Sequence, residues 1–193
     1  ELEGKTITEN MSALTAENDR IKVITADKNK EQQAVLKNIS EKNSRLRVLT
    51  EFKRDYEGYY GGVKAVLKLR DSDTKGFEGI KGAVGEVITM PSELETAIEI
   101  ALGGAVQNII ADTEENVKTA INYLKQNRLG RATFLPMNAV KGRTLGADKY
   151  KLTSAKGVIG IAKELISYDS KYEGVMSSLL ERVIVVDNID NGI

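Results

Sequence analysis

Two glutamates come closest to a catalytic arrangement in this sequence. Glu86 and Glu164 occupy the same place in two related stretches, GIKGAVGEVI and GVIGIAKELI. Two carboxylates that converge on one site can supply the acid and the base of a hydrolysis. The sequence completes no such site, because it has no histidine and no cysteine and lacks the Walker A, G-x-S-x-G and H-E-x-x-H motifs. We therefore expect these glutamates to be exposed structural positions, with no enzymatic activity, no cofactor and no metal.

Basic side chains next to aromatic ones form a second group of chemical interest. Lysine or arginine beside tyrosine is the composition of a platform for single-stranded nucleic acid, and Tyr56, Tyr59 and Tyr60 follow such a cluster. Across the chain 28 basic and 28 acidic residues balance, so any attraction to nucleic acid would be local. We predict weak DNA contact or, as the alternative, an ordinary solvated surface. The candidate DNA contacts are Arg45, Arg47, Lys53 and Arg54.

Closely spaced glycines in the two related stretches raise the question of a phosphate-binding loop. Gly79-Ile-Lys-Gly82 has the outline of the loop that clamps nucleic-acid backbone in KH domains. The second stretch keeps the two glycines but replaces Lys81 with isoleucine and Gly85 with lysine. Since the basic residue is not kept, we interpret the shared glycines as structural turns. These turn glycines are Gly79, Gly82, Gly157 and Gly160.

The two stretches begin a longer internal repeat. Residues 79–95 align with residues 157–173 at a shift of 78, and the match continues without a gap into the helices that follow. Each copy is expected to run through a helix, over 92–102 or 171–180, into a strand that ends in an aspartate. Ser-x-x-Glu opens both helices, which predicts a capping box at each start. The agreement of glycines, caps and apolar helix faces indicates a duplicated unit.

The N-terminal part of the chain has a different pattern. Residues 1–57 contain no proline and one glycine, and their apolar residues follow the alternating 4-3 spacing of a coiled-coil seam. A helix of this length would extend about 80 Å. It cannot bury its own apolar stripe and therefore requires a partner helix. The seam is weakest over 22–34, and a partly frayed helix is the alternative. The seam residues are Ile7, Met11, Leu14, Ile21, Val35, Ile39, Leu46, Leu49 and Tyr56.

The remaining residues indicate a mixed α/β fold. From Gly58 onward glycine becomes frequent, and β-branched runs alternate with helical patterns. No apolar run approaches the roughly 20 residues that span a bilayer, so we expect no membrane contact. Expected elements are helices over 61–70 and 113–127, strands over 105–112, 130–136 and 182–187, apolar segments near 83–88 and 161–166, and a polar, basic loop over 141–156.

At this point the sequence resembles a known family. Residues 56–193 are similar to the hinge domain of SMC (structural maintenance of chromosomes) proteins, and the start of this region is most like bacterial SMC. The sharpest element is GRATFLP directly after a helix. The resemblance rests on YEGYYGGVKAVL (56–67), GIKGAVGEVI (79–88), ELETAIEIALGGAVQNIIAD (93–112), AINYLKQNRLGRATFLP (120–136) and GVIGIAKELISYD (157–169).

The resemblance implies a domain layout. We expect a coiled-coil arm helix over 1–57, a first hinge subdomain over 58–128 and a second over 129–193, the two being pseudo-symmetric. SMC hinges lie at the tip of long antiparallel arms whose far ends carry ATPase heads. The family pattern continues beyond the point that matches Ile193, with a further strand segment, a glycine-rich stretch and the returning arm helix. The second subdomain is therefore expected to be truncated, and the antiparallel partner of the arm helix to be absent from this chain.

The resemblance also implies a function. SMC hinges join two chains into the V or ring that condenses and segregates chromosomes, which predicts a homodimer in the cytoplasm at the nucleoid. The interface is expected over the segment 134–140, with weak DNA binding near the arm junction. The alternative function is a nucleic-acid-binding module in which dimerisation is incidental, and an enzyme based on the two glutamates ranks third. The interface candidates are Phe134, Leu135 and Val140.

Overall fold

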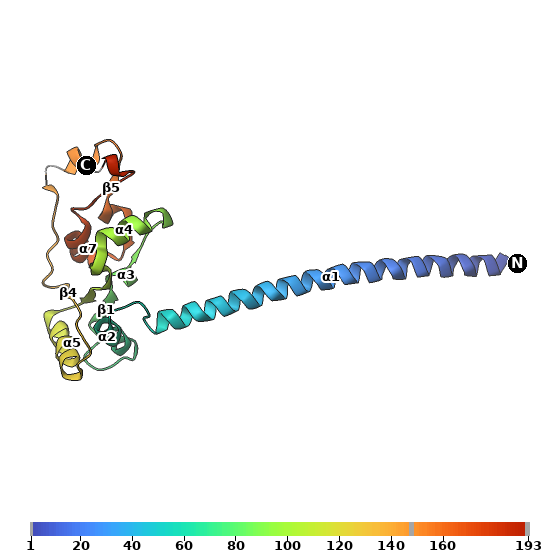
Figure 1. The fold of residues 1–193 in the computed structure, drawn as a ribbon, viewed down its shortest axis with the longest axis horizontal. Coiled ribbons are helices and arrows are strands. Elements are labelled where there is room, and N and C mark those ends of the chain that lie inside the picture. Colours follow the sequence, from blue (N-terminus) through green and yellow to red (C-terminus); the bar gives the residue numbers. More distant parts are fainter. Residues whose placement is uncertain (1, 147–148, 192–193) are drawn as a thin grey trace. The chain divides into compact units, whose positions relative to one another are not determined.

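The computed structural model describes residues 2–146 and 149–191. The chain divides into two compact units, Glu1–Arg54 and Asp55–Ile193, and each is described by itself. The first unit is a single helix, α1 (Leu2–Arg54), of 53 residues (Figure 1). At about 1.5 Å per residue it extends about 80 Å. It runs through the weak part of the predicted seam without a break, and ends three residues before the expected boundary.

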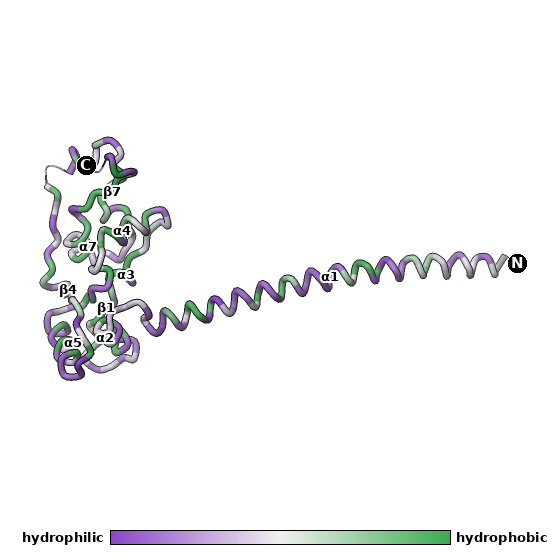
Figure 2. The backbone as a smooth tube through the Cα atoms, in the orientation of Figure 1, coloured by the Kyte–Doolittle hydropathy of each residue, from purple (hydrophilic) through white to green (hydrophobic). Residues whose placement is uncertain are grey.

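The apolar stripe of α1 is open to solvent in this chain. Figure 2 shows hydrophobic residues returning at intervals between hydrophilic ones along the whole helix. Seam side chains such as Leu14 and Leu46 are 70% and 63% exposed. A stripe of this kind is stabilised in a protein by packing against another helix rather than by helix propensity alone. No such helix covers it among the described residues.

The second unit, called the C-terminal unit below, contains short helices and strands. Its first part comprises α2 (Gly61–Asp71), β1 (Ile80–Ala83), α3 (Val84–Val87), β2 (Ile88–Thr89), η1 (Ser92–Leu94), α4 (Glu95–Leu102), η2 (Gly103–Gln107), β3 (Ile109–Ala111), α5 (Glu114–Asn127) and β4 (Phe134–Pro136). Its second part comprises α6 (Lys149–Thr153), β5 (Val158–Ile161), η4 (Ala162–Leu165), β6 (Ser167–Tyr168), η5 (Ser170–Tyr172), α7 (Glu173–Leu180), β7 (Ile184–Val186) and η6 (Ile189–Asn191).

Three small sheets organise the C-terminal unit. The largest has the strand order β1-β3-β4, with β1 antiparallel and β4 parallel to β3. The other two are the antiparallel pairs β5-β7 and β2-β6. The helices α2 and α5 lie beside β1 and β4, while α4 and α7 lie together in the other part of the unit (Figure 1). The observed mixture of helices and small sheets agrees with the predicted α/β fold class.

Two hydrophobic cores lie on opposite faces of β3. Ile109 and Ala111 belong to the first core, with α2 and α5, whereas Ile110 between them belongs to the second core, with α4 and α7. Alternation of this kind follows from the pleat, because successive side chains of a strand point to opposite faces. The second core combines residues from 84–110 with residues from 162–185. The predicted division at 128/129 stays a prediction, and packing joins the two sides of it.

The internal repeat is present in the backbone. We call residues 79–112 the first repeat and residues 157–187 the second repeat. In β1-β3 the register slips between Ile80 and Gly82, and in β5-β7 it slips between Val158 and Gly160, at the same step. In both repeats the amide after the last strand donates to the carbonyl of the glycine before the first strand, at 2.9 Å. The prediction of a duplicated unit is confirmed.

The predicted helix caps are wrong. Ser92 and Ser170 begin short 3-10 turns, η1 and η5, and neither serine caps a helix through its side chain. In the second repeat Asp169, one position earlier, accepts the amide of Lys171 at 3.1 Å instead. A carboxylate is a stronger acceptor than a hydroxyl. The expected capping residue Glu173 is engaged elsewhere, as described below.

Other differences concern the lengths of the elements. The strand expected over 105–112 is shortened, because the turn η2 occupies its first residues and β3 begins at Ile109. The strand expected over 130–136 is reduced to β4, and the loop expected over 141–156 contains α6. The helix expected over 113–127 is confirmed as α5, with the Thr113 hydroxyl accepting the amide of Asn116. Burial of its apolar face against the first core fixes this helix in place.

Candidate assembly interface and polar networks

The predicted interface segment is an edge strand followed by a tight turn. β4 pairs with β3 on one side, with Phe134 opposite Ile109, and ends the order β1-β3-β4. Its other edge is not paired within the described residues. The chain then turns back, with the amide of Val140 donating to the carbonyl of Pro136 at 2.9 Å. An unpaired strand edge can bind a strand of another molecule through main-chain hydrogen bonds.

The three interface candidates share an intermediate exposure. Phe134 packs partly on the first core, while Leu135 and Val140 pack partly on the second. The backbone at Val140 lies close to α7. A Cβ added to Gly174 of α7 would lie 3.3 Å from the carbonyl oxygen of Val140. These side chains are thus half inside their own unit. What remains exposed is an apolar border along an open strand edge.

The turn glycines are required for two different reasons. Gly82 and Gly157 have φ angles of 139° and 77°, in the region where only glycine is unstrained. A side chain at Gly79 would collide with Asn116, and one at Gly160 would have its Cβ 3.2 Å from a leucine side chain. The lysine of the glycine loop is paired, with Lys81 Nζ 2.7 Å from an aspartate carboxylate. This environment is that of a packed turn rather than of a phosphate clamp.

The candidate DNA contacts all lie on α1, near its end. They are exposed, and Arg47 makes an ion pair with Glu51 at 3.2 Å. The aromatic platform expected next to them is wrong for one of its members. Tyr56, in the C-terminal unit, is 6% exposed and belongs to the first core, so its ring is not available for stacking. Tyr60 is 65% exposed.

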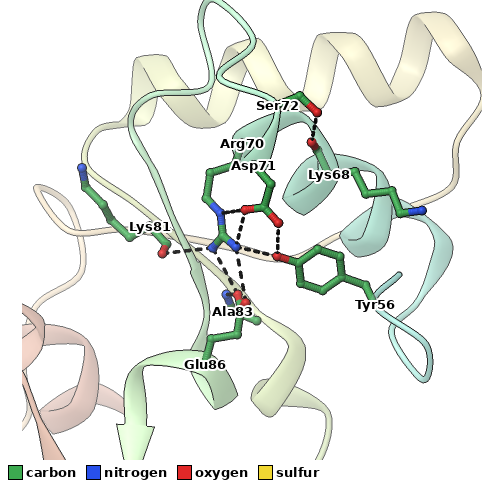
Figure 3. A network of polar contacts seen from close by, with 8 residues as sticks. All are labelled: Tyr56, Lys68, Arg70, Asp71, Ser72, Lys81, Ala83 and Glu86. Atoms are coloured by element: carbon green, nitrogen blue, oxygen red, sulfur yellow. Dashed lines mark hydrogen bonds and ion pairs between the residues drawn. The ribbon is translucent and has the colours of Figure 1, made fainter. Parts of the chain in front are cut away.

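A polar cluster around Arg70, the Arg70 network, lies at the start of the C-terminal unit (Figure 3). Nη2 of Arg70 donates to the Tyr56 hydroxyl at 2.6 Å, and Nη1 donates to Glu86 Oε2 at 3.2 Å. The Tyr56 hydroxyl in turn donates to Asp71. Glu86 Oε2 also accepts the amide of Ala83 at 2.8 Å. The network links Tyr56 and α2 to α3, the short helical turn that follows β1.

Arg70 and Asp71 hold each other in their ionised forms, while Tyr56 beside them is kept neutral. Burial, followed by the hydrogen bond to Asp71, raises the pKa of Tyr56 well above its usual value. Burial opposes the charge of Arg70, but hydrogen bonds to Glu86 and Asp71 outweigh it and raise the pKa of Arg70. In the same way, burial is outweighed by the hydrogen bonds from Tyr56 and Arg70, which lower the pKa of Asp71. Glu86 is therefore a partner of a partly buried guanidinium.

A second polar cluster, the Lys163 network, belongs to the second repeat. Lys163 Nζ lies 2.8 Å from Glu173 Oε1, 2.6 Å from Glu181 Oε2 and 3.2 Å from the hydroxyl of Ser177. The Tyr168 hydroxyl donates to Glu173 Oε2 at 2.7 Å. Hydrogen bonds from Lys163, Tyr168 and Ser177 lower the pKa of Glu173 to about 2. Burial, followed by the hydrogen bond to Glu173, raises the pKa of Tyr168 to about 12.

The two glutamates that suggested catalysis are bound to different cations. Glu86 belongs to the Arg70 network, and Glu164 pairs with Lys149 of α6.

Among the described residues no group of histidine, cysteine, aspartate and glutamate is arranged to hold a metal ion. Within the same residues no helix is long and apolar enough to cross a membrane.

The Lys163 network was not predicted from the sequence. Its one sequence signal was the lysine that replaces Gly85 in the second copy.

Comparison with known proteins identifies the family. A sequence model of the SMC proteins' flexible hinge domain matches residues 77–193, more than half of the chain. The chain therefore belongs to the SMC hinge family. The matched region is a hinge domain and not an ATPase head.

Three individual proteins show how far the similarity extends. The chromosome partition protein Smc of Lactiplantibacillus plantarum is 35% identical over 189 residues, which are 96% of this chain but 16% of that protein. An asymmetric dimer of the Geobacillus stearothermophilus SMC hinge domain is 42% identical, with a TM-score of 0.74, over 79% of this chain and 60% of that one. The Pyrococcus furiosus Smc hinge domain with an extended coiled coil is 28% identical, with a TM-score of 0.55, over 96% and 64%.

Proposed function

We propose that this chain is the dimerisation hinge of an SMC protein that partitions chromosomes. The observation that carries the proposal is the open edge of β4, bordered by the half-exposed side chains of Phe134, Leu135 and Val140. The similar hinge from G. stearothermophilus is a dimer. In this function the β4 edge and the turn after it would bind a second copy of the chain. The ATPase heads and the location at the nucleoid belong to the proposed parent protein.

The apolar stripe on α1 supports the proposal that this helix is a coiled-coil arm of the SMC protein. Its exposed heptad residues call for an antiparallel partner helix, and a similar hinge from P. furiosus carries an extended coiled coil. We infer that α1 is the outgoing arm and that its partner helix is a separate segment of the parent protein.

The dimer is tested by measuring molar mass against concentration. Phe134→Lys places a charge in the interface and is expected to shift the mass toward the monomer, because an unpaired buried charge strongly opposes association. Ala139→Arg changes an exposed position of the same turn and gives a second reading if Phe134→Lys fails to fold. Ile100→Lys, at a side chain 76% exposed on α4, is the matched control. Folded interface variants with the wild-type mass would show that the interface lies elsewhere.

Weak DNA contact is the second candidate function. Within the described part of the chain, the side chains of Arg45 and Lys53 make no ion pair or hydrogen bond, so their charges are available for phosphates. Arg45→Glu and Lys53→Glu are expected to weaken binding of single-stranded DNA at low salt and to reduce the salt slope by about one for each phosphate that the variant no longer neutralises. Lys30→Glu on the same helix is the control. Equal weakening in all three variants would remove the assignment to the end of α1.

A further inference from the structure

An unfilled cleft lies in the first repeat. It has a volume of about 430 Å³ and lies between α3, β2, α4 and η2. Its walls are mostly apolar, and two glutamates of α4 stand at its border. The lining residues are Gly85, Ile88, Thr89, Met90, Glu95, Ile98, Glu99, Leu102 and Val106.

The second repeat shows what the same space contains when it is filled. The shift between the repeats is 78 residues through α4 and α7, and it is 75 from Val106 onward, since Ile109 and Ile184 hold equivalent register positions. By this alignment Gly85 corresponds to Lys163. The lysine side chain therefore starts from the position where the first repeat has no side chain.

The surroundings of that lysine correspond to the rest of the cleft. Glu95 corresponds to Glu173, which accepts from Lys163 at 2.8 Å, and Met90 corresponds to Tyr168, which donates to the same carboxylate. The walls at Glu99 and Val106 are replaced in the second repeat by the hydroxyl of Ser177 and the carboxylate of Glu181. The cleft of the first repeat is thus the lysine site of the second repeat without its lysine.

The charges of the cleft fit the missing group. Glu95 and Glu99 line it one helical turn apart, and neither side chain makes an ion pair or hydrogen bond with another described residue. The floor is apolar, with Ile98 fully buried and Leu102 nearly so. A lysine presents the complementary shape, because it carries an apolar four-carbon stem and a compact ammonium with three donors.

We propose that the cleft of the first repeat binds a lysine side chain presented by a partner protein. The stem would lie along the apolar side chains of Ile98 and Val106, and the ammonium would pair with Glu95 and Glu99. The inference is independent of the proposed dimer, since β4 does not line the cleft.

The direct test uses a short peptide as the probe. Acetyl-Gly-Gly-Lys-Gly-Gly-amide is titrated into the isotope-labelled chain, and amide shifts are followed by NMR. We expect saturable shifts at Gly85, Thr89 and Val106, with binding about tenfold weaker in the variant Glu95→Gln/Glu99→Gln, because hydrogen bonds to charged groups are the stronger ones. The same peptide with norleucine, which keeps the stem and lacks the ammonium, is expected to bind at least tenfold more weakly.

A second variant tests the cleft without removing its acids. Gly85→Lys/Val106→Ala places a lysine at the position occupied in the second repeat, and the alanine makes room where a Cβ on residue 85 would lie 2.9 Å from Val106. Peptide binding is expected to disappear in this variant and to be kept in Ile100→Lys, which adds the same charge to the exposed side of α4.

Three outcomes would overturn the proposal. The first is the absence of saturable binding, and the second is binding that is unaffected by both double variants. The third is concentration-dependent association of the wild-type chain with itself that Glu95→Gln/Glu99→Gln abolishes, which would assign the cleft to a second copy. The molar-mass measurement on Phe134→Lys separates that result from a failure of the β4 interface.

Discussion

The two repeats of the C-terminal unit have the same backbone and different polar interiors. Their strand registers slip at the same step, and the same main-chain hydrogen bonds close both. In both repeats the equivalent glutamate pairs with a cation from outside the repeat, Glu86 with Arg70 of α2 and Glu164 with Lys149 of α6. The second repeat has in addition the cation Lys163, at the position of Gly85, which pairs with Glu173 and Glu181. A shared backbone pattern is therefore compatible with an additional buried ion pair in one repeat that the other repeat lacks.

The largest expected effect comes from removing the internal cation. Lys163→Met leaves the carboxylate of Glu181, 7% exposed, buried without its partner. Breaking a buried ion pair from one side typically costs about 3–5 kcal/mol. We expect a loss of about 3 kcal/mol in the free energy of unfolding, measured by urea denaturation. Lys149→Met, which removes the half-exposed partner of Glu164, should change it by less than about 1 kcal/mol. A similar small change in both variants would show that Glu181 is solvated.

The equivalent glycines provide a sharper test of the comparison. Gly82→Ala forces an alanine into a φ of 139° and places its Cβ 2.8 Å from both Arg70 and Glu86. Gly160→Ala has no positive φ, and its Cβ would lie 3.2 Å from a flexible leucine. We expect a loss of about 2 kcal/mol for Gly82→Ala and less than about 1 kcal/mol for Gly160→Ala. Thermal unfolding of the two variants measures the difference, and equal losses would mean that the shared fold matters more than the local contacts.

The smallest expected effect is a dependence on acid. The pKa of Glu173 is lowered to about 2 from its usual value of 4.5. Its contribution to stability is therefore complete above about pH 4.5 and is lost as the pH falls through about 2. Since its side chain is 55% exposed, we expect less than about 1 kcal/mol. Denaturation between pH 5 and 2 should show a shallower loss for Glu173→Gln than for the wild type. Glu95→Gln, the equivalent carboxylate of the first repeat, is the control.

The parts of the fold that could be predicted are those with local patterns. The heptad seam predicted α1, the amphipathic spacing after Thr113 predicted α5, and the pairs of glycines and aspartates predicted the repeat. These signals lie within a few residues of one another, so the sequence displays them directly.

The parts that could not be predicted depend on contacts between distant residues. Lys163 meets Glu173 and Glu181, ten and eighteen positions away, and no helical or strand period connects them. Tyr56 fits the seam by spacing, but burial in the first core and the hydrogen bond to Asp71 decide its place. The capping serines were wrong for a different, local reason: both begin 3-10 turns, and in the second repeat the neighbouring Asp169 accepts the amide instead. The interface and DNA-contact residues stay predictions.

The pairing of β2 with β6 has a consequence for the history of the fold. Thr89 faces Ser167 in this pair, and the shift of 78 makes these two residues counterparts, so a position of one repeat contacts its own equivalent in the other. That is the self-complementary geometry of a twofold homodimer contained in one polypeptide. Two identical chains in such a dimer must change together, because any mutation appears on both sides. Once fused, the halves are free to diverge, and one of them can carry a lysine where the other carries a glycine.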